Sequence, residues 1–341
     1  MIHQMAPWVP QFIQSCKNHT QAFVPFTFAT VDTQTMKPKC RTVIFRDFLF
    51  HDKRSNVLTF TSDLRGDKVK EIRGNGETTA PFEACFYFPN TWEQYRFSGE
   101  CFVVSQRDMP AVVQHYASQD AGLIAYPILS PSVCGHIQEL LKYDRCSHGE
   151  EGDGNGNCAH HDESQDATPE GHETNAHNHG HTHTPGAGGA GGARARPSAL
   201  DADDDTARVL SRTSTRSSGC TPKRDILSPA DYKPPSAHEW QLELQRQWAI
   251  LSRSTKAQFR KPDPGTPLTS GTSQQLDKIQ RGVDGANENA GFDNFGVVCL
   301  CVHQVDYLNL KDGRGGERWK YNCHREPGTR LETWVEEEVC P

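Results

Sequence analysis

The stretch Arg41-Thr-Val-Ile-Phe-Arg46 places a β-branched and aromatic run between two arginines. Residues of this kind favour a β-strand that is at least half buried. Successive side chains of a strand point to opposite faces of the sheet, so Arg41 and Arg46 lie on opposite faces unless the strand twists or bulges. The stretch therefore predicts a strand with a cation at each end, and a regular strand cannot bring both cations to one ligand.

Further along the chain, Thr61-Ser-Asp-Leu-Arg-Gly-Asp-Lys68 predicts the end of a strand, a turn and the start of a helix. Such a junction offers free backbone N–H groups and the positive end of a helix dipole. Thr61, Ser62, Arg65 and Lys68 add hydroxyl donors and cations, which together suit a phosphate monoester. The alternative is an ordinary helix N-cap with solvated surface cations, and the residues alone leave both interpretations open.

Strand patterns surround these two stretches. Alternating or β-branched runs occur at 26–31, 57–62, 82–88, 95–104, 295–303, 305–310, 318–323 and 330–337. Helical patterns occur at 68–73, 109–126, 132–143 and 235–252. Many strands without a repeated βαβ pattern favour a mainly β fold, namely a small β-barrel with peripheral helices.

The composition changes abruptly in the middle of the chain. Residues 145–228 contain only five large apolar side chains and no aromatic one, and they hold half of the sixteen histidines. Such a segment cannot bury enough apolar surface to offset chain entropy, so we expect 145–229 to be a disordered His/Gly-rich insertion. The flanking parts, 1–144 and 230–341, are expected to form one barrel domain, because neither has enough strands to close a barrel. A polar loop is expected at 269–291.

Charge and cysteine content limit the class of protein. The chain has 341 residues, 36 Lys and Arg against 43 Asp and Glu, and a net charge of −7. A modestly acidic chain has no field that draws it onto nucleic acid. No stretch approaches the roughly 20 apolar residues of a membrane span, and residues 1–10 do not resemble a signal peptide. Twelve scattered cysteines are expected to be reduced. We expect a cytoplasmic protein, with nuclear entry open.

Three motifs in order resemble the FMN-binding split barrel of the pyridoxamine 5'-phosphate oxidase type. They are Arg41-Thr-Val-Ile-Phe-Arg46, Phe60-Thr-Ser-Asp-Leu-Arg-Gly-Asp-Lys68 and Phe88-Pro-Asn-Thr-Trp-Glu-Gln94-Tyr-Arg-Phe-Ser-Gly99. The branch described only as an oxidase-like FMN-binding domain is the most similar. Its later features recur as Arg246-Gln-Trp248-Ala-Ile-Leu-Ser252, Gln258-Phe-Arg-Lys-Pro-Asp-Pro264-Gly and the closing Trp334 and Pro341. The resemblance therefore spans both folded parts.

The resemblance implies FMN as cofactor and roles for particular residues. The strand made of Arg41, Thr42, Val43, Ile44, Phe45 and Arg46 would line the isoalloxazine and ribityl chain. Thr61, Ser62, Lys68 and Arg65 would hold the FMN phosphate, and Gln94 would hydrogen-bond the flavin. The family also implies a homodimer with each FMN between the subunits.

Departures from the family pattern concern activity more than cofactor binding. Asp67 stands where the oxidase has a second cation, and Gly66 where a serine is usual. Arg318-Trp-Lys320 stands where the oxidase has an Arg-x-His pair. Arg46, Arg318 and Lys320 are candidate substrate-side cations by position, and no catalytic residue is assigned.

Three functions stay open at this point. The first is FMN-dependent oxidation of pyridoxamine or pyridoxine 5'-phosphate, or of a related small amine or alcohol, with oxygen as acceptor. The second is a non-catalytic FMN-binding module. The third is a metal buffer acting through His177-x-His-x-His-x-His183. Alternating histidines on a flexible chain bind Zn²⁺, Ni²⁺ or Cu²⁺ but lack the fixed geometry of a dedicated site, so we assign no metal site.

Overall fold

The structure is a computed structural model that describes residues 3–74, 79–108, 128–144, 231–282, 285–287, 289–311, 315–325 and 332–341. The chain divides into two compact units, Met1–Glu151 with Lys223–Pro341, and Gly152–Pro222. All described residues belong to the first unit. The expected insertion at 145–229 and the expected helix at 109–126 lie outside the described residues.

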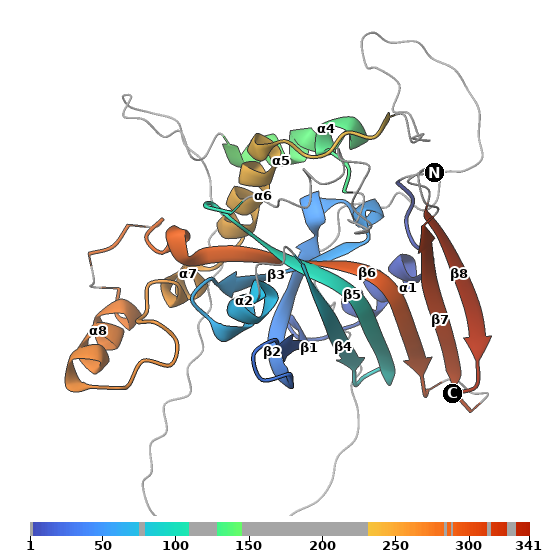
Figure 1. Ribbon diagram of the computed structural model, residues 1–341, viewed down its shortest axis with the longest axis horizontal. Coiled ribbons are helices and arrows are strands. Elements are labelled where there is room, and N and C mark those ends of the chain that lie inside the picture. Colours follow the sequence, from blue (N-terminus) through green and yellow to red (C-terminus); the bar gives the residue numbers. More distant parts are fainter. Residues whose placement is uncertain are drawn as a thin grey trace, which may run out of the picture. The chain divides into compact units, whose positions relative to one another are not determined.

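Eight antiparallel strands form one sheet (Figure 1). They are β1 (Val24–Asp32), β2 (Lys37–Phe48), β3 (Val57–Asp63), β4 (Ala80–Phe88), β5 (Glu93–Ser105), β6 (Phe295–Asn309), β7 (Glu317–Arg325) and β8 (Glu332–Val339). Their order is β3-β2-β1-β4-β5-β6-β7-β8, and β3 also pairs with β6. That pairing closes a six-stranded barrel, which β7 and β8 extend from β6. The predicted mainly β barrel is confirmed, and β6 from the C-terminal part is the strand that closes it.

Helices lie around the barrel. They are α1 (Trp8–Lys17), α2 (Asp67–Ile72), α4 (Pro131–Cys134), α5 (Ile137–Asp144), α6 (Ala237–Ala249), α7 (Arg253–Gln258) and α8 (Ser270–Gln280), with short 3-10 turns at Leu49–His51, Lys53–Ser55 and Phe292–Asn294. Within the described ranges, no helix combines the length and the apolar character that crossing a membrane requires.

Several element boundaries differ from the sequence prediction. The prediction of a polar loop at 269–291 is wrong for Ser270–Gln280, which form α8. The helix is stabilised there because the Thr269 and Thr272 side chains form a capping box and Ile279 is buried. Helix α1 was not predicted, although its buried Trp8 and Phe12 follow helical spacing. The helix expected at 132–143 is broken by Gly135, which has a left-handed backbone (φ 78°).

The strands expected at 295–303 and 305–310 are one strand, β6. Its register against β5 shifts at Ser98 and Gly99, which is a β-bulge. A Cβ atom on Gly99 would lie 2.0 Å from the carbonyl oxygen of Cys301. Only glycine therefore permits the two strands to approach this closely where the sheet bends.

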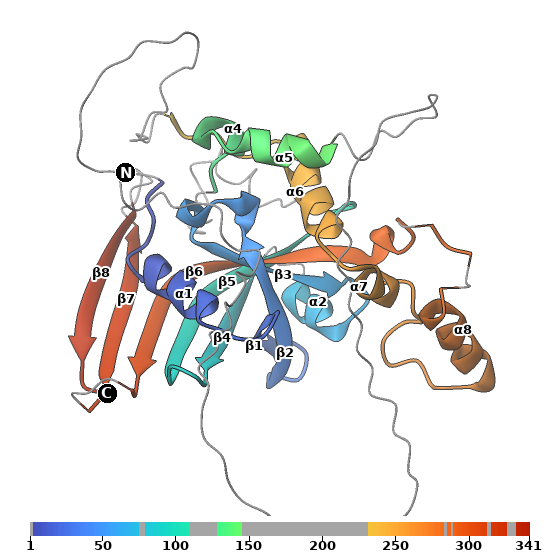
Figure 2. The same cartoon turned by 180° about the vertical axis from the view of Figure 1, so that it is seen from behind.

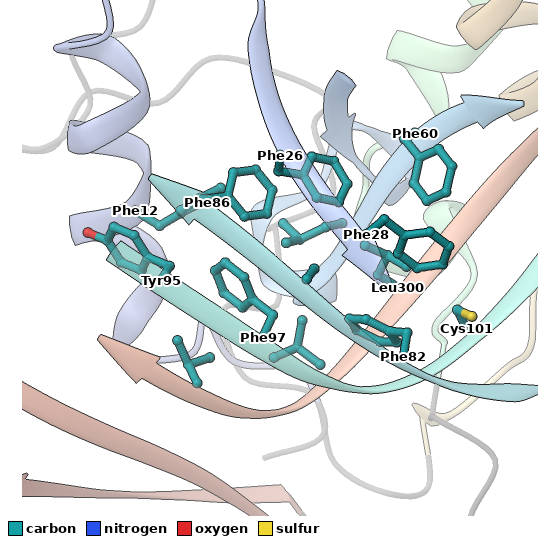
Figure 3. Close-up of a cluster of buried hydrophobic side chains, with 14 of the residues drawn as sticks. Phe12, Phe26, Phe28, Phe60, Phe82, Phe86, Tyr95, Phe97, Cys101 and Leu300 are labelled. Carbon is teal, nitrogen blue, oxygen red and sulfur yellow. The ribbon is translucent and has the colours of Figure 1, made fainter. Parts of the chain in front are cut away.

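An aromatic core fills the barrel (Figure 3). The rings of Phe26 and Phe86 stack with centres 4.3 Å apart, and Phe28 meets Phe60 edge to face at 4.9 Å. Phe12 of α1 packs against the ring of Phe86 at 5.0 Å. Each fully buried ring contributes roughly 1.5–3 kcal/mol by removal from water, so this core holds the strands that carry the candidate site in a rigid frame.

Candidate functional site

A β-bulge in β2 re-aims one of the two arginines. β2 pairs with β3 at Phe45 and again at Asp47, where two residues of β2 oppose one of β3. Arg46 is the extra residue, and its Nε donates a hydrogen bond to Thr61 Oγ1 at 3.3 Å. Its guanidinium also stands 5.9 Å from the ring centre of Phe23. The bulge therefore turns Arg46 toward the end of β3, which a regular strand need not do.

Lys68 reaches the same place from α2. Its Nζ donates to Ser62 Oγ at 3.3 Å. A Cβ atom on Gly66 would lie 3.4 Å from that Nζ and 3.3 Å from the carbonyl oxygen of Asp63. Because Gly66 has no side chain, the lysine can fold back over the loop toward the hydroxyl.

The backbone amides of this loop are used internally. The N–H of Leu64 donates to Asn294 O at 2.9 Å, and that of Gly66 donates to Asp63 O at 3.2 Å. The N–H of Arg65 donates to Asp63 Oδ1 at 2.9 Å. The sequence-based expectation of free N–H groups is therefore wrong for these three residues.

A cavity of about 260 Å³ joins these side chains. Its walls come from β2, β3, α2 and the end of α7, which lie beside one another in both views (Figure 2). The lining residues are Thr42, Val43, Ile44, Arg46, Thr61, Ser62, Asp63, Lys68, Thr255, Gln258 and Phe259. Seven residues predicted for FMN binding are thus brought together in one cavity.

The cavity favours an anion. Burial lowers the pKa of Lys68, and the nearby charge of Arg41 lowers it further. Burial likewise lowers the pKa of Arg46. Among the residues that the structure describes, no carboxylate lies within ion-pairing distance of either cation. Two partly desolvated cations beside two hydroxyls would gain from a phosphate, because charge-assisted hydrogen bonds are the strong ones.

Arg65 does not line the cavity. Its Nη2 pairs with Asp63 Oδ2 at 2.6 Å, and its Nη1 pairs with Asp263 Oδ1 at 2.8 Å. It also donates to the carbonyl oxygens of Lys261 and Phe259. The hydrogen bond to Asp63 raises the pKa of Arg65. Arg65 therefore neutralises the one carboxylate in the cavity wall and ties the loop to the chain that follows α7.

Three other predicted residues also lie outside the cavity lining. Arg41 donates to Thr30 Oγ1 at 2.6 Å and pairs with Glu71. The Phe45 ring packs 5.5 Å from that of Phe12 in the barrel core. Gln94 lies on β5, between β4 and β6. Of these, Arg41 still acts on the cavity through its charge near Lys68.

The two candidate substrate-side cations of the C-terminal part lie on β7. Arg318 donates from Nε and Nη2 to the two carboxylate oxygens of Asp306, at 2.9 and 2.8 Å. Arg96 of β5 pairs with the same carboxylate, and Lys320 is the ladder partner of Asp306. This basic cluster does not include any residue of the cavity lining.

Sequence reasoning did not assign a role to Thr255 and Gln258 of α7 or to Phe259, which follows that helix. The stretch beginning at Gln258 resembles the family, but nothing in its spacing indicates that it reaches β2 and β3. The start of α7 could have been predicted from the sequence, because serine is a favoured N-cap residue. In the structure, Ser252 accepts a hydrogen bond from the N–H of Thr255 at 3.2 Å. The contact with the cavity is purely tertiary.

The chain was compared with known proteins. Residues 5–105 match the family model of the pyridoxamine 5'-phosphate oxidase FMN-binding domain. The chain is 47% identical over 353 residues to the uncharacterized protein YGR017W of Saccharomyces cerevisiae, covering 100% of both chains. It is 38% identical over 69 residues to pyridoxine/pyridoxamine 5'-phosphate oxidase 2 of Arabidopsis thaliana, covering 20% of this chain and 31% of that protein.

Solved structures were also compared. A pyridoxamine 5'-phosphate oxidase-related, FMN binding protein from Nostoc punctiforme aligns with a TM-score of 0.47 at 18% identity, covering 98% of each chain. PhzG from Burkholderia lata aligns with a TM-score of 0.44 at 8% identity, covering 97% of this chain and 89% of that one.

Proposed function

The chain belongs to the pyridoxamine 5'-phosphate oxidase-like family of FMN-binding proteins, with FMN as cofactor, and on this premise we propose that the cavity between β2, β3, α2 and α7 binds the FMN phosphate. The observation that carries the proposal is the pair of cations, Arg46 and Lys68, each hydrogen-bonded to a hydroxyl and without a carboxylate partner in the described chain. The donor set fits a phosphate monoester, because the wall carboxylate of Asp63 is already neutralised by Arg65.

The remaining FMN contacts follow from the shape of the cavity. Thr42, Val43 and Ile44 of β2 would line the ribityl chain and the edge of the ring. A volume of about 260 Å³ is below the roughly 300–1,000 Å³ of pockets that enclose a whole cofactor-sized ligand. We therefore propose that a second subunit covers the ring in a cytoplasmic homodimer and that Gln94 contacts the flavin there.

Bound FMN supplies the redox chemistry, and the residues of this chain bind and orient it. We propose that the substrate is a small amine or alcohol, with pyridoxamine or pyridoxine 5'-phosphate as the first candidates and oxygen as acceptor. Arg318 and Lys320 are proposed to attract the anionic end of the substrate, with Arg46 as a further candidate. No catalytic residue is assigned, because among the described residues that line the cavity the titratable groups are Arg46 and Lys68, which are proposed to hold the phosphate, and Asp63, which pairs with Arg65.

A second candidate is a non-catalytic FMN-binding module. Two observations favour it. Lys320 stands where the family oxidase has a histidine, and two of the three donor nitrogens of Arg318, Nε and Nη2, are already bonded to Asp306. Oxygen consumption by the FMN-loaded protein with pyridoxamine and pyridoxine 5'-phosphate separates the two, since only the oxidase turns over.

The phosphate assignment is tested by Lys68→Ala. Loss of one charged hydrogen bond costs about 1.5–3 kcal/mol, so we expect the Kd for FMN to rise about 10- to 150-fold. The measurement is flavin fluorescence quenching on titration of the FMN-free protein. The matched control is Lys70→Ala, two residues along the same helix, where an exposed lysine pairs with Asp67. Lys70→Ala should bind FMN as tightly as the wild type. Equal losses in both variants, or no loss in Lys68→Ala, would place the phosphate elsewhere.

A further inference from the structure

A second cluster of polar side chains lies away from the FMN cavity, at the turn after β2. It brings together His3 from the N-terminal segment, Asp52 from the turn and Cys134 from the end of α4, whose ligand atoms all lie within 4.8 Å of one another. The side chains of His3 and Asp52 are each only 6% exposed. Three segments that are far apart in sequence thus converge on one buried point.

The two oxygens of Asp52 have different surroundings. Oδ1 accepts from the backbone N–H of Arg54 at 3.0 Å and lies 3.5 Å from Arg54 Nε. Oδ2 faces two imidazoles, with His3 Nε2 at 2.6 Å and His136 Nε2 at 3.5 Å. The Cys134 thiol approaches the same group and makes no hydrogen bond to any residue in the described ranges. One carboxylate oxygen is therefore surrounded by nitrogen and sulfur donors.

The backbone around the cluster holds these donors in place. The N–H of Ala6 donates to Asn56 Oδ1, and Asn56 Nδ2 donates to Gln4 O, both at 2.9 Å, so the N-terminal segment is fixed to the turn. Gly135 ends α4 with a left-handed backbone. That turn lets Cys134 and His136, on either side of the glycine, approach the same carboxylate.

We propose that His3, Asp52 and Cys134 bind a Zn²⁺ ion, and that His136 reorients to complete a tetrahedral site. Nitrogen, oxygen and thiolate sulfur are the ligands that zinc takes, and around a tetrahedral ion they stand about 3.3–3.8 Å apart. The distance of 3.5 Å between His136 Nε2 and Asp52 Oδ2 already matches this range. The distance of 2.6 Å between His3 Nε2 and Asp52 Oδ2 has to lengthen. His136 also meets Arg54 Nη2 at 3.0 Å, so it is the ligand that must reorient.

Charge supports the assignment. One carboxylate and one thiolate balance the two positive charges of the ion, and the two imidazoles bind it as neutral ligands. Hydrogen bonds alone would satisfy Asp52, but they do not account for the Cys134 sulfur within 4.8 Å of the buried carboxylate. The ion would join the N-terminal segment, the turn and α4, which makes it a structural site independent of FMN.

The test uses the full chain with Co²⁺ in place of Zn²⁺, because a cobalt–thiolate bond produces a charge-transfer absorption in the near ultraviolet. Protein purified without a metal-affinity step and stripped with a chelator is titrated with Co²⁺. The wild type should show the band at about one equivalent, and Zn²⁺ should displace it. Cys134→Ser should lose the band, and His3→Gln should weaken Co²⁺ binding at least 10-fold, as loss of one ligand implies.

Controls separate this site from the histidine tract, which here means the whole His/Gly-rich insertion at 145–229. Cys146→Ser and Cys158→Ser, in that tract, and Cys40→Ser, on an exposed strand position, should all keep the band. The FMN content of each variant reports whether the barrel has folded. If Cys134→Ser does not fold, His3→Gln tests the site in its place. The proposal is overturned if the wild type shows no thiolate band, if Cys134→Ser and His3→Gln retain it unchanged, or if only the tract variants lose it.

Discussion

Arg65 and Lys68 occupy one loop, but the structure places them in different surroundings. Lys68 lies in the cavity, where burial lowers its pKa. In the absence of an anion, burial therefore disfavours the charged form of this lysine. Arg65 has two carboxylates and two carbonyl oxygens as partners. The first residue is arranged to receive a ligand, and the second stabilises the loop that carries it.

This difference predicts opposite effects on the FMN-free protein. Arg65→Ala leaves Asp63 unpaired in the cavity wall and should lower the free energy of unfolding by about 1–3 kcal/mol. Lys68→Ala removes a partly buried, unpaired cation and should leave that free energy unchanged or raise it. Urea unfolding of both FMN-free variants measures the difference. A Lys68→Ala protein as destabilised as Arg65→Ala would contradict this division of roles.

Two bulges shape the strands at the element scale. The bulge at Arg46 turns a side chain toward β3, whereas the shift at Ser98 and Gly99 keeps the long strands β5 and β6 in register past a bend. Each bulge adds one extra residue to one strand of a pair, which changes the direction of the side chains beyond it. The site depends on the first bulge, and closure of the barrel depends on the second.

Gly99→Ala tests the second bulge. A methyl group there would lie 2.0 Å from Cys301 O, and the strands cannot separate without breaking the ladder, so we expect a loss of at least about 2 kcal/mol in the free energy of unfolding. The control is Gly271→Ala inside α8, where the nearest atom lies 3.9 Å away. That change should stabilise by up to about 1 kcal/mol. Thermal and urea unfolding compare the two, and a Gly99→Ala protein of wild-type stability would refute the close approach.

At the scale of the whole molecule, the N- and C-terminal parts share one compact unit. β6 closes the barrel against β3, and Thr255 and Gln258 of α7 line the cavity that we propose for the FMN phosphate. A buried ion pair adds to this, since Arg246 of α6 bonds Glu243 beside it and Asp47 of β2, both at 2.7 Å. Losing one partner of such a pair is costly because a buried charge is left uncompensated.

The middle unit is predicted to be dispensable for FMN binding. Replacing residues 152–222 by a flexible Gly/Ser linker should leave the Kd for FMN and the melting temperature close to the wild-type values, because every cavity residue lies in the other unit. FMN titration and thermal unfolding check this. Under the metal-buffer hypothesis the same deletion would abolish function. Loss of FMN binding on deletion would show that the barrel requires the middle unit.

Local pattern was enough for most of the strands and for the fold class, and it indicated the phosphate loop as one of two interpretations. Alternation at 26–31 and 57–62 identifies β1 and β3. Thr61, Ser62 and Lys68 line the cavity as expected, whereas Arg65 does not. These features depend on residues close together in sequence, so their periodicity can be recognised within a short window of the chain. The family resemblance added FMN, which no periodicity indicates.

Other features arose only in three dimensions. Arg65 pairs with Asp263, which lies almost two hundred positions later in the sequence. Gln258, which follows the insertion in sequence, lines the cavity formed mainly by residues that precede it. His3, Asp52 and Cys134 meet without any spacing that resembles a metal motif. Bulges, long-range ion pairs and convergent ligands depend on which strands pair and in what register. That choice is made by burial of the whole aromatic core, which local propensity does not encode.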